Sequence, residues 1–161
     1  MSSDLLRARA TAEELGDLCR VEVHTDERLR ETFGGHWQGR TVTELMAADA
    51  EAYVEWRSGA DVPAGGGERR TQVATRVVAA IGAALTGVPE GGTLVVVTHG
   101  GSARAAIGTL LDLPLDRWAV VGGLANCCWS VLEEVPEPAS AWRLVEHNAG
   151  SLPEPVLSDE E

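Results

Sequence analysis

Apolar residues recur at helical spacing between Glu68 and Leu85. Val73, Val77, Ile81 and Leu85 follow one another at intervals of four residues, which places them on one face of a helix. Glycine and proline follow within four residues of the last of them, and both end helices. The sequence therefore predicts an amphipathic helix over 68–85 that packs this face against the core.

A different pattern follows at 94–97. The run Leu-Val-Val-Val is apolar without alternation, which is typical of a parallel strand buried on both faces. Residues 98–101, Thr-His-Gly-Gly, then form a turn, and 102–111 predict a helix. Ligands of open α/β sheets bind at the carboxyl ends of the strands. We therefore expect His99 to lie in a ligand site.

The other segments complete a mixed α/β pattern. We expect helices over 5–16 and 41–56 and strands over 20–24, 128–133 and 142–147, the last two as an antiparallel edge pair. Gly16 is expected to end the first helix. The positions expected to be buried in the first three of these elements are Leu5, Ala8, Ala12, Leu15, Val21, Val23, Leu45, Met46 and Tyr53.

Length and charge limit the classes of protein. A chain of 161 residues is one domain with a substantial core, which we place at 1–150, followed by a disordered acidic tail at 151–161. Its 13 basic and 25 acidic residues give a net charge of −12, which argues against nucleic acid or an anionic membrane as partner. No apolar run reaches membrane length.

Cysteine use indicates a reducing compartment. Cys19, Cys127 and Cys128 are odd in number and have neither disulfide-framework nor metal-site spacing. The first twenty residues lack the apolar core of a signal peptide. We therefore expect a cytoplasmic protein with reduced thiols and no metal.

The turn after residue 97 suits an anion such as phosphate. Gly100 and Gly101 allow backbone N–H groups to approach a ligand, the next helix adds the positive end of its dipole, and Arg104 lies one turn in. The glycine spacings of P-loop and Rossmann proteins are absent. Taken alone, His99 is also consistent with a turn residue that is hydrogen-bonded to backbone.

Three more residues have both a functional and a structural interpretation. Glu31 lies in a segment rich in charge, glycine and aromatics, where it is either a general acid or base or a surface carboxylate paired with a nearby arginine. Arg7 is either a ligand group or a solvated helix residue. Trp37 is either a packing anchor or a platform for a substrate.

Four stretches together resemble the histidine phosphatase superfamily, also called the phosphoglycerate mutase-like family. In chain order they are SSDLLRARATA, RLRETFGGHWQG, PAGGGER and VVVTHGG. The start, the RLRET loop, LPLDRWAVVGGLANCCW and WRLVEHNAG are most similar to its actinobacterial glucosyl-3-phosphoglycerate phosphatase branch. The resemblance implies a three-layer α/β/α sandwich with a mostly parallel sheet.

The resemblance also implies roles for individual residues. In that family phosphate passes through a phosphohistidine on an Arg-His-Gly motif, and a second histidine, two arginines and a carboxylate complete the site. Arg7 then clamps the phosphate, Glu31 donates a proton to the leaving group and His99 hydrogen-bonds the phosphoryl oxygens. Gly100, Arg104 and Trp37 are expected to contact substrate, and no metal or cofactor is required.

The Arg-His-Gly motif does not occur among the 161 residues. Three explanations stay open: a fragment of a longer phosphatase that is truncated at the N-terminus, a pseudoenzyme that binds phosphorylated ligands without turnover, and a strand supplied by another chain. The family's first strand would lie beside 94–97. Without it we expect an apolar sheet edge and a chain that is marginally stable or forms a homo-oligomer through that edge.

The resulting prediction is hydrolysis of a small phosphorylated metabolite of phosphoglycerate type. A non-catalytic phospholigand-binding module is the alternative from another class. Phosphoglycerate mutase action is a further alternative, which the short stretch between Glu31 and His99 disfavours because the long insertion expected of cofactor-dependent mutases is missing.

Overall fold

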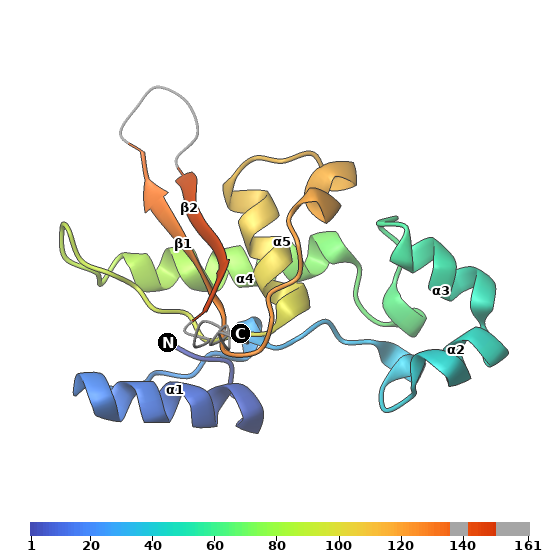
Figure 1. Ribbon diagram of the computed structural model, residues 1–161, viewed down its shortest axis with the longest axis horizontal. Coiled ribbons are helices and arrows are strands. Elements are labelled where there is room, and N and C mark those ends of the chain that lie inside the picture. The colour runs from blue at the N-terminus through green and yellow to red at the C-terminus, as the bar shows by residue number, and fades with distance from the viewer. Residues whose placement is uncertain (136–141, 151–161) are drawn as a thin grey trace, which may run out of the picture.

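Helix α4, Arg70–Leu85, runs through the middle of the fold, and α5, Gly100–Leu110, packs across it (Figure 1). The computed structural model describes residues 1–135 and 142–150. Both helices confirm the sequence prediction to within two residues at their ends. The main core gathers along α4; its buried members are Leu29, Val73, Ala74, Val77, Ala80, Ile81, Ala105, Ala106 and Trp118.

The α4–α5 contact depends on small residues. Alanines from both helices lie in the core, so the two backbones approach closely. Trp118, in the 3-10 segment η4 (Leu115–Val120), covers Gly108 of α5 and donates from Nε1 to the carbonyl of Leu113 at 3.0 Å. A methyl group on Gly108 would lie 2.7 Å from Trp118 Cδ1, so this position has no room for a side chain.

Helix α1, Leu6–Cys19, is longer than predicted. Gly16 lies inside it instead of ending it, and the helix ends at Arg20, whose φ is 56°. A methyl group on Gly16 would lie 2.7 Å from Val23 Cγ2, so the glycine is explained by close packing. Ala8 and Ala12 are buried as expected, whereas Leu15 is 40% exposed.

The single helix predicted over 41–56 is two helices. Helix α2, Val42–Ala48, begins with a capping box between Thr41 and Glu44, and α3, Ala50–Arg57, follows a break at Asp49, where φ is −155°. Leu45 and Tyr53 are buried as predicted, but Met46 faces solvent because the break changes the face that each half presents. The second core cluster consists of Trp37, Leu45, Tyr53 and Ala64.

Two short 3-10 segments hold the long connections in place. Segment η2, Gly35–Trp37, lies against η3, Ala64–Gly66, and Ala64 and Gly65 are buried there. Segment η1, Glu27–Leu29, is capped by Asp26 and brings Leu29 into the main core.

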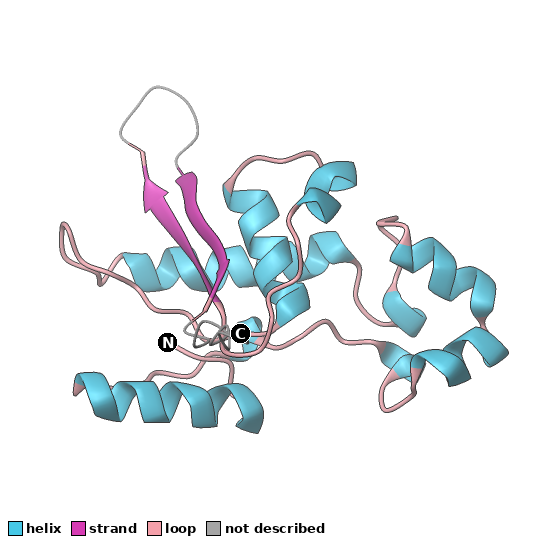
Figure 2. Cartoon of the chain, in the orientation of Figure 1, coloured by secondary structure: helices cyan, strands magenta, loops and turns pink. Residues whose placement is uncertain are grey.

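The sheet differs most from the prediction. Strands β1, Trp129–Glu134, and β2, Trp142–Ala149, form the expected antiparallel pair, and they are the only strand pair of the described residues (Figure 2). The residues between them at 136–141 and the predicted tail at 151–161 lie outside the described part.

Among the described residues, the extended segment 94–97 has one backbone neighbour, the start of the chain. Ser3 N–H donates to the Val97 carbonyl at 2.9 Å, and Val97 N–H donates to the Met1 carbonyl at 3.0 Å. Ser2 forms isolated parallel bridges to Val97 on one side and to Thr25 on the other. The mostly parallel sheet is thus represented here by these bridges alone.

Two burial predictions fail for the same reason. Leu94 and Val96 pack on the main core, but Val95 is 50% exposed, so this segment is covered on one face and not on two. The strand predicted over 20–24 is irregular, and Val21 is 61% exposed. An apolar run shows that a segment can be buried, but its neighbours decide which faces are covered.

None of the helices in the described residues combines the length and the apolar character needed to cross a bilayer.

We expect Gly108→Ala to destabilise the fold by about 1–3 kcal/mol, because the added methyl group overpacks the contact with Trp118. The control is Gly82→Ala on α4, where nothing lies within 4 Å of the added group and relief of the glycine entropy stabilises by about 0.5–1 kcal/mol. Urea unfolding measures both. Equal effects of the two changes would contradict the packing assigned to Gly108.

Candidate active site

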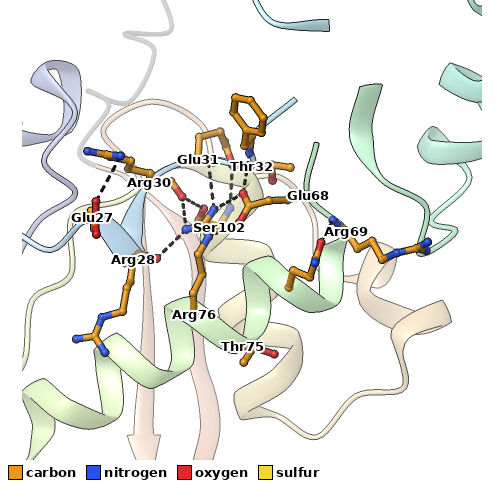
Figure 3. Close-up of polar contacts among 12 residues, drawn as sticks. Glu27, Arg28, Arg30, Glu31, Thr32, Glu68, Arg69, Thr75, Arg76 and Ser102 are labelled. Carbon is orange, nitrogen blue, oxygen red and sulfur yellow. Dashed lines mark hydrogen bonds and ion pairs between the residues drawn. The ribbon is translucent and has the colours of Figure 1, made fainter. Parts of the chain in front are cut away.

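One arginine on α4 binds the loop that carries Glu31 (Figure 3). Arg76 donates from Nε and Nη2 to the two carboxylate oxygens of Glu68, at 2.7 and 2.8 Å. Its other N–H groups donate to the carbonyls of Arg28, Arg30 and Glu31, at 2.7, 2.7 and 3.2 Å. All five donors of the guanidinium are used. Arg76 therefore fixes the loop and has no donor left for a ligand.

Glu68 completes this link. Its Oε2 also accepts the backbone N–H of Phe33 at 2.8 Å, and the Glu68 N–H donates to the Phe33 carbonyl at the same distance. Burial on its own raises the pKa of Glu68, but the hydrogen bonds from Arg76 and from Phe33 outweigh it and hold the pKa below its ordinary value. The Arg76–Glu68 pair is therefore ionic at neutral pH.

The prediction from sequence did not include Arg76 or Glu68. The available signal is an arginine directly before the buried Val77, within a helix whose apolar stripe faces the core. A charge at the border of such a stripe needs a partner, and the helix pattern alone does not say which one.

The Glu31 carboxylate lies at the N-terminus of α5. Its Oε2 accepts the Gly101 N–H at 3.0 Å, and its Oε1 accepts the N–H groups of Ser102 and Thr32, at 3.1 and 2.8 Å. A helix N-terminus presents free N–H groups and a positive dipole end, which suit a carboxylate. A methyl group on Gly101 would clash with Glu31 Oε1, so this glycine admits the carboxylate.

The glycine turn therefore already holds an anion from within the chain. The sequence predicts that Gly100 and Gly101 cradle a ligand, whereas in the structure the Gly101 N–H donates to Glu31. Ser102 strengthens the same contact, since its buried hydroxyl donates to the Arg30 carbonyl at 2.6 Å. Gly100, ahead of them, is exposed.

His99 directly precedes α5 and faces Ser3. Its Nε2 lies 2.9 Å from Ser3 Oγ, and Ser3 is fully buried. Burial, and after it the positive charge of Arg7, lowers the pKa of His99 below its ordinary value of about 6.5. His99 is therefore a neutral imidazole at neutral pH, held by a serine that the sequence prediction did not include.

Arg7 lies near this pair with its guanidinium free. It is in the first turn of α1 and is exposed. Its charge acts on His99, but among residues 1–135 and 142–150 the guanidinium has no hydrogen bond or ion pair. The structure thus brings Arg7, Glu31 and His99 to one end of α5, and of these three only Arg7 has its charged group unoccupied.

Trp37 lies elsewhere, inside the second core cluster. It is 7% exposed and contacts Tyr53 and Trp56 edge to face, with ring centroids 5.7 and 5.9 Å apart. A methyl group on Gly65 would lie 2.5 Å from Trp37 Cγ. This environment is that of the packing anchor, and substrate contact by Trp37 stays a prediction.

Arg104 lies one turn into α5 and lines a small pocket with Arg57, Arg70 and Trp118. The residues that line this pocket include none of Arg7, Glu31 and His99. Contact between Arg104 and a phosphate held at His99 therefore also stays a prediction.

The sequence model of the histidine phosphatase superfamily (branch 1) matches residues 1–149, which include every residue of this site. The chain belongs to the histidine phosphatase superfamily. In the described residues, no group of three or more His, Cys, Asp or Glu side chains could hold a metal ion.

Two similar proteins have the same name, glucosyl-3-phosphoglycerate phosphatase. Glucosyl-3-phosphoglycerate phosphatase of Mycolicibacterium vanbaalenii is 42% identical over 135 residues, which are 80% of this chain and 60% of the relative. The enzyme of the same name from Mycobacterium tuberculosis is 37% identical over 94% of this chain and 73% of its own length. This chain therefore spans about 60–73% of these curated relatives.

A solved structure agrees with the fold. The complex of a mycobacterial glucosyl-3-phosphoglycerate phosphatase with inorganic phosphate is 38% identical, with a TM-score of 0.85 over 92% of this chain and 75% of the other. The phosphoglycerate mutase-like histidine phosphatase fold of this chain is thereby shown.

The lowered pKa of His99 predicts a pH dependence of stability. The unfolded chain takes up a proton near the ordinary pKa of about 6.5, whereas folded His99 resists it. As the pH falls below 6.5 toward the lower folded pKa, the unfolded state is favoured and stability is lost.

We therefore expect His99→Gln, which keeps a hydrogen-bonding group for Ser3, to lose less stability than wild type between pH 7.5 and 5.5. Urea unfolding at both pH values measures this, and His24→Gln, on an exposed histidine, is the control. If His99→Gln had the same pH slope as wild type, the buried neutral imidazole would be refuted.

Proposed function

We propose that this chain carries the phosphate-binding part of a phosphomonoesterase for a small metabolite of phosphoglycerate type. The observation that carries the proposal is the unpaired guanidinium of Arg7 beside neutral His99. A phosphoryl group presents several acceptor oxygens, which match arginine and imidazole donors. The names of the relatives support a phosphorylated glycerate as substrate.

Glu31 is proposed as the proton donor to the leaving group. Each of its oxygens accepts at least one backbone N–H, so a protonated Glu31 has to release one of these bonds to turn toward a substrate.

The 161 residues do not include the Arg-His-Gly motif that carries the family's nucleophile. None of the four histidines lies between an arginine and a glycine. We infer that the short parallel bridges of Ser2 belong to the mostly parallel sheet of an α/β/α sandwich formed within residues 1–150, and that an Arg-His-Gly strand beside 94–97 is needed for turnover.

Three further proposals concern the location of the protein, its partners and residues 151–161. Free thiols at all three cysteines support a cytoplasmic location, and the net charge of −12 supports a partner other than nucleic acid. Residues 151–161 are proposed as a tail outside the phosphatase-like unit.

The test compares this chain with a fusion in which an Arg-His-Gly strand of a family member precedes Met1. We expect hydrolysis of 3-phosphoglycerate by the fusion and a loss of roughly 100- to 1,000-fold on His99→Gln, with His24→Gln as control. We expect the chain alone to bind inorganic phosphate through Arg7 without turnover.

Other outcomes separate the alternatives. Formation of 2-phosphoglycerate would identify mutase action, and saturable binding by a fusion without turnover would identify a binding module. Phosphate binding that is unaffected by Arg7→Gln and His99→Gln would overturn the proposed site.

We also propose self-association through the segment 94–97, since Val95 is half exposed and the backbone of this segment has one neighbour within residues 1–135 and 142–150. Light scattering should show a homo-oligomer, and Val95→Lys should convert it to monomer because a charge blocks edge pairing. A monodisperse wild-type monomer with a sharp thermal transition would contradict this proposal.

A further inference from the structure

A second cluster of arginines surrounds a small pocket at the side of α5. The pocket lies among the end of α3, the start of α4, α5 and η4, and has a volume of about 40 Å³. Its charged lining residues are Arg57, Arg70, Arg104 and Asp116. A single buried water needs about 10–15 Å³ of such space, so the pocket has room for a group of only a few atoms, such as the oxygens of a carboxylate or phosphate.

Hydrogen-bond donors around the pocket lack acceptors. Arg104 Nε and Arg70 Nε are both buried, and among the described residues neither has a partner. Trp56 Nε1 is a third such donor, and its ring lies 4.6 Å from the Arg70 guanidinium. Buried donors without acceptors are costly. The group that would satisfy them is one that only accepts.

The guanidinium groups of the pocket differ in the hydrogen bonds that they make. Arg70 donates from Nη2 to the Trp56 carbonyl at 2.6 Å, and Arg57 is exposed and lies 3.4 Å from the Tyr53 hydroxyl. Arg104 has no hydrogen bond or ion pair to any described residue. It is therefore the least satisfied positive charge of the pocket.

Nearby carboxylates do not neutralise this cluster. Asp116 is exposed and lies 3.9 Å from Arg117. Asp61 attracts Arg70 from a distance, but its carboxylate accepts hydrogen bonds from Thr71. Burial, and then repulsion from Arg104, lowers the pKa of Arg70. Two like charges are thus held close together in a chain with a net charge of −12.

We propose that Arg70 and Arg104 together bind a small oxyanion, a carboxylate or phosphate group, in this pocket between α4 and α5. The anion would accept from N–H groups of both guanidiniums and separate the two positive charges. Because none of Arg7, Glu31 and His99 lines the pocket, this site is distinct from the proposed phosphoryl site, and its existence does not depend on turnover.

The test measures inorganic phosphate binding by calorimetry in the full chain with Arg7→Gln and His99→Gln, which remove the proposed phosphoryl site. We expect saturable binding to persist and to weaken roughly 10- to 100-fold on Arg104→Gln or Arg70→Gln, as loss of a charge-assisted hydrogen bond predicts. The matched controls, Arg9→Gln and Arg143→Gln, remove the same charge at exposed ion pairs and should leave binding unchanged.

Two results would overturn the proposal: no phosphate binding in the Arg7→Gln/His99→Gln protein, or binding that Arg104→Gln leaves intact. Either would leave the proposed phosphoryl site untouched, because that site is tested through Arg7 and His99 in the wild-type background.

Affinities for further ligands distinguish an oxyanion that is part of a substrate from a free anion. A loss of 3-phosphoglycerate affinity on Arg104→Gln without a loss for glycerol 3-phosphate, in the wild-type background, would identify the carboxylate arm of a substrate. A loss for inorganic phosphate in the Arg7→Gln/His99→Gln background would identify a free anion.

Thermal unfolding provides a readout that a merely structural arginine would not give. Arg104→Met removes an unpartnered buried charge, so without anion we expect its melting temperature to equal or exceed that of wild type. Phosphate should raise the melting temperature of wild type and not of the variant. A variant that is less stable without phosphate, but gains as much from it, would refute the site.

Discussion

Convergence of three backbone carbonyls on one guanidinium fixes the loop that carries Glu31 into the candidate site. Arg76 binds the carbonyls of Arg28, Arg30 and Glu31 together with the Glu68 carboxylate. Only arginine offers five donors in one rigid plane, so a lysine here could not hold the loop in the same way. Because the loop is fixed, the Glu31 side chain reaches the N-terminus of α5, and the contact links helices α4 and α5 at the end where His99 lies.

The arginines of this acidic chain divide into two groups by their bonding. Arg76 is saturated and binds structure, whereas Arg7 and Arg104 have no partner among the described residues and Arg70 is only partly bound. A buried or half-buried guanidinium without an acceptor lowers the stability of the fold. For Arg70 and Arg104 a bound anion would remove this cost, whereas exposed Arg7 keeps its charge in solvent and is free to bind a ligand.

The helical pattern of Val73, Val77 and Ile81 was sufficient to predict α4, and the strand, glycine turn and helix order was sufficient to place His99 before α5. Both signals are local, since they depend on spacing within one element. Coverage of Val95, the break at Asp49 and the partner of Arg76 depend on segments distant in the chain. The family resemblance located Arg7 and Glu31, but it could not show that Glu31 fills the anion position which the glycine turn was expected to offer a ligand.

That position of Glu31 bears directly on how acid catalysis would work here. A carboxylate that caps α5 stabilises the helix end and draws Gly101 and Ser102 toward the loop. Donation of a proton to a leaving group needs the carboxyl to give up one of these N–H contacts. A phosphate bound between Arg7 and His99, as proposed, would supply the compensation if its oxygens accepted the N–H group that Glu31 releases. Substrate binding and activation of the acid would then be one event, driven by exchange of one anion for another at the same helix end.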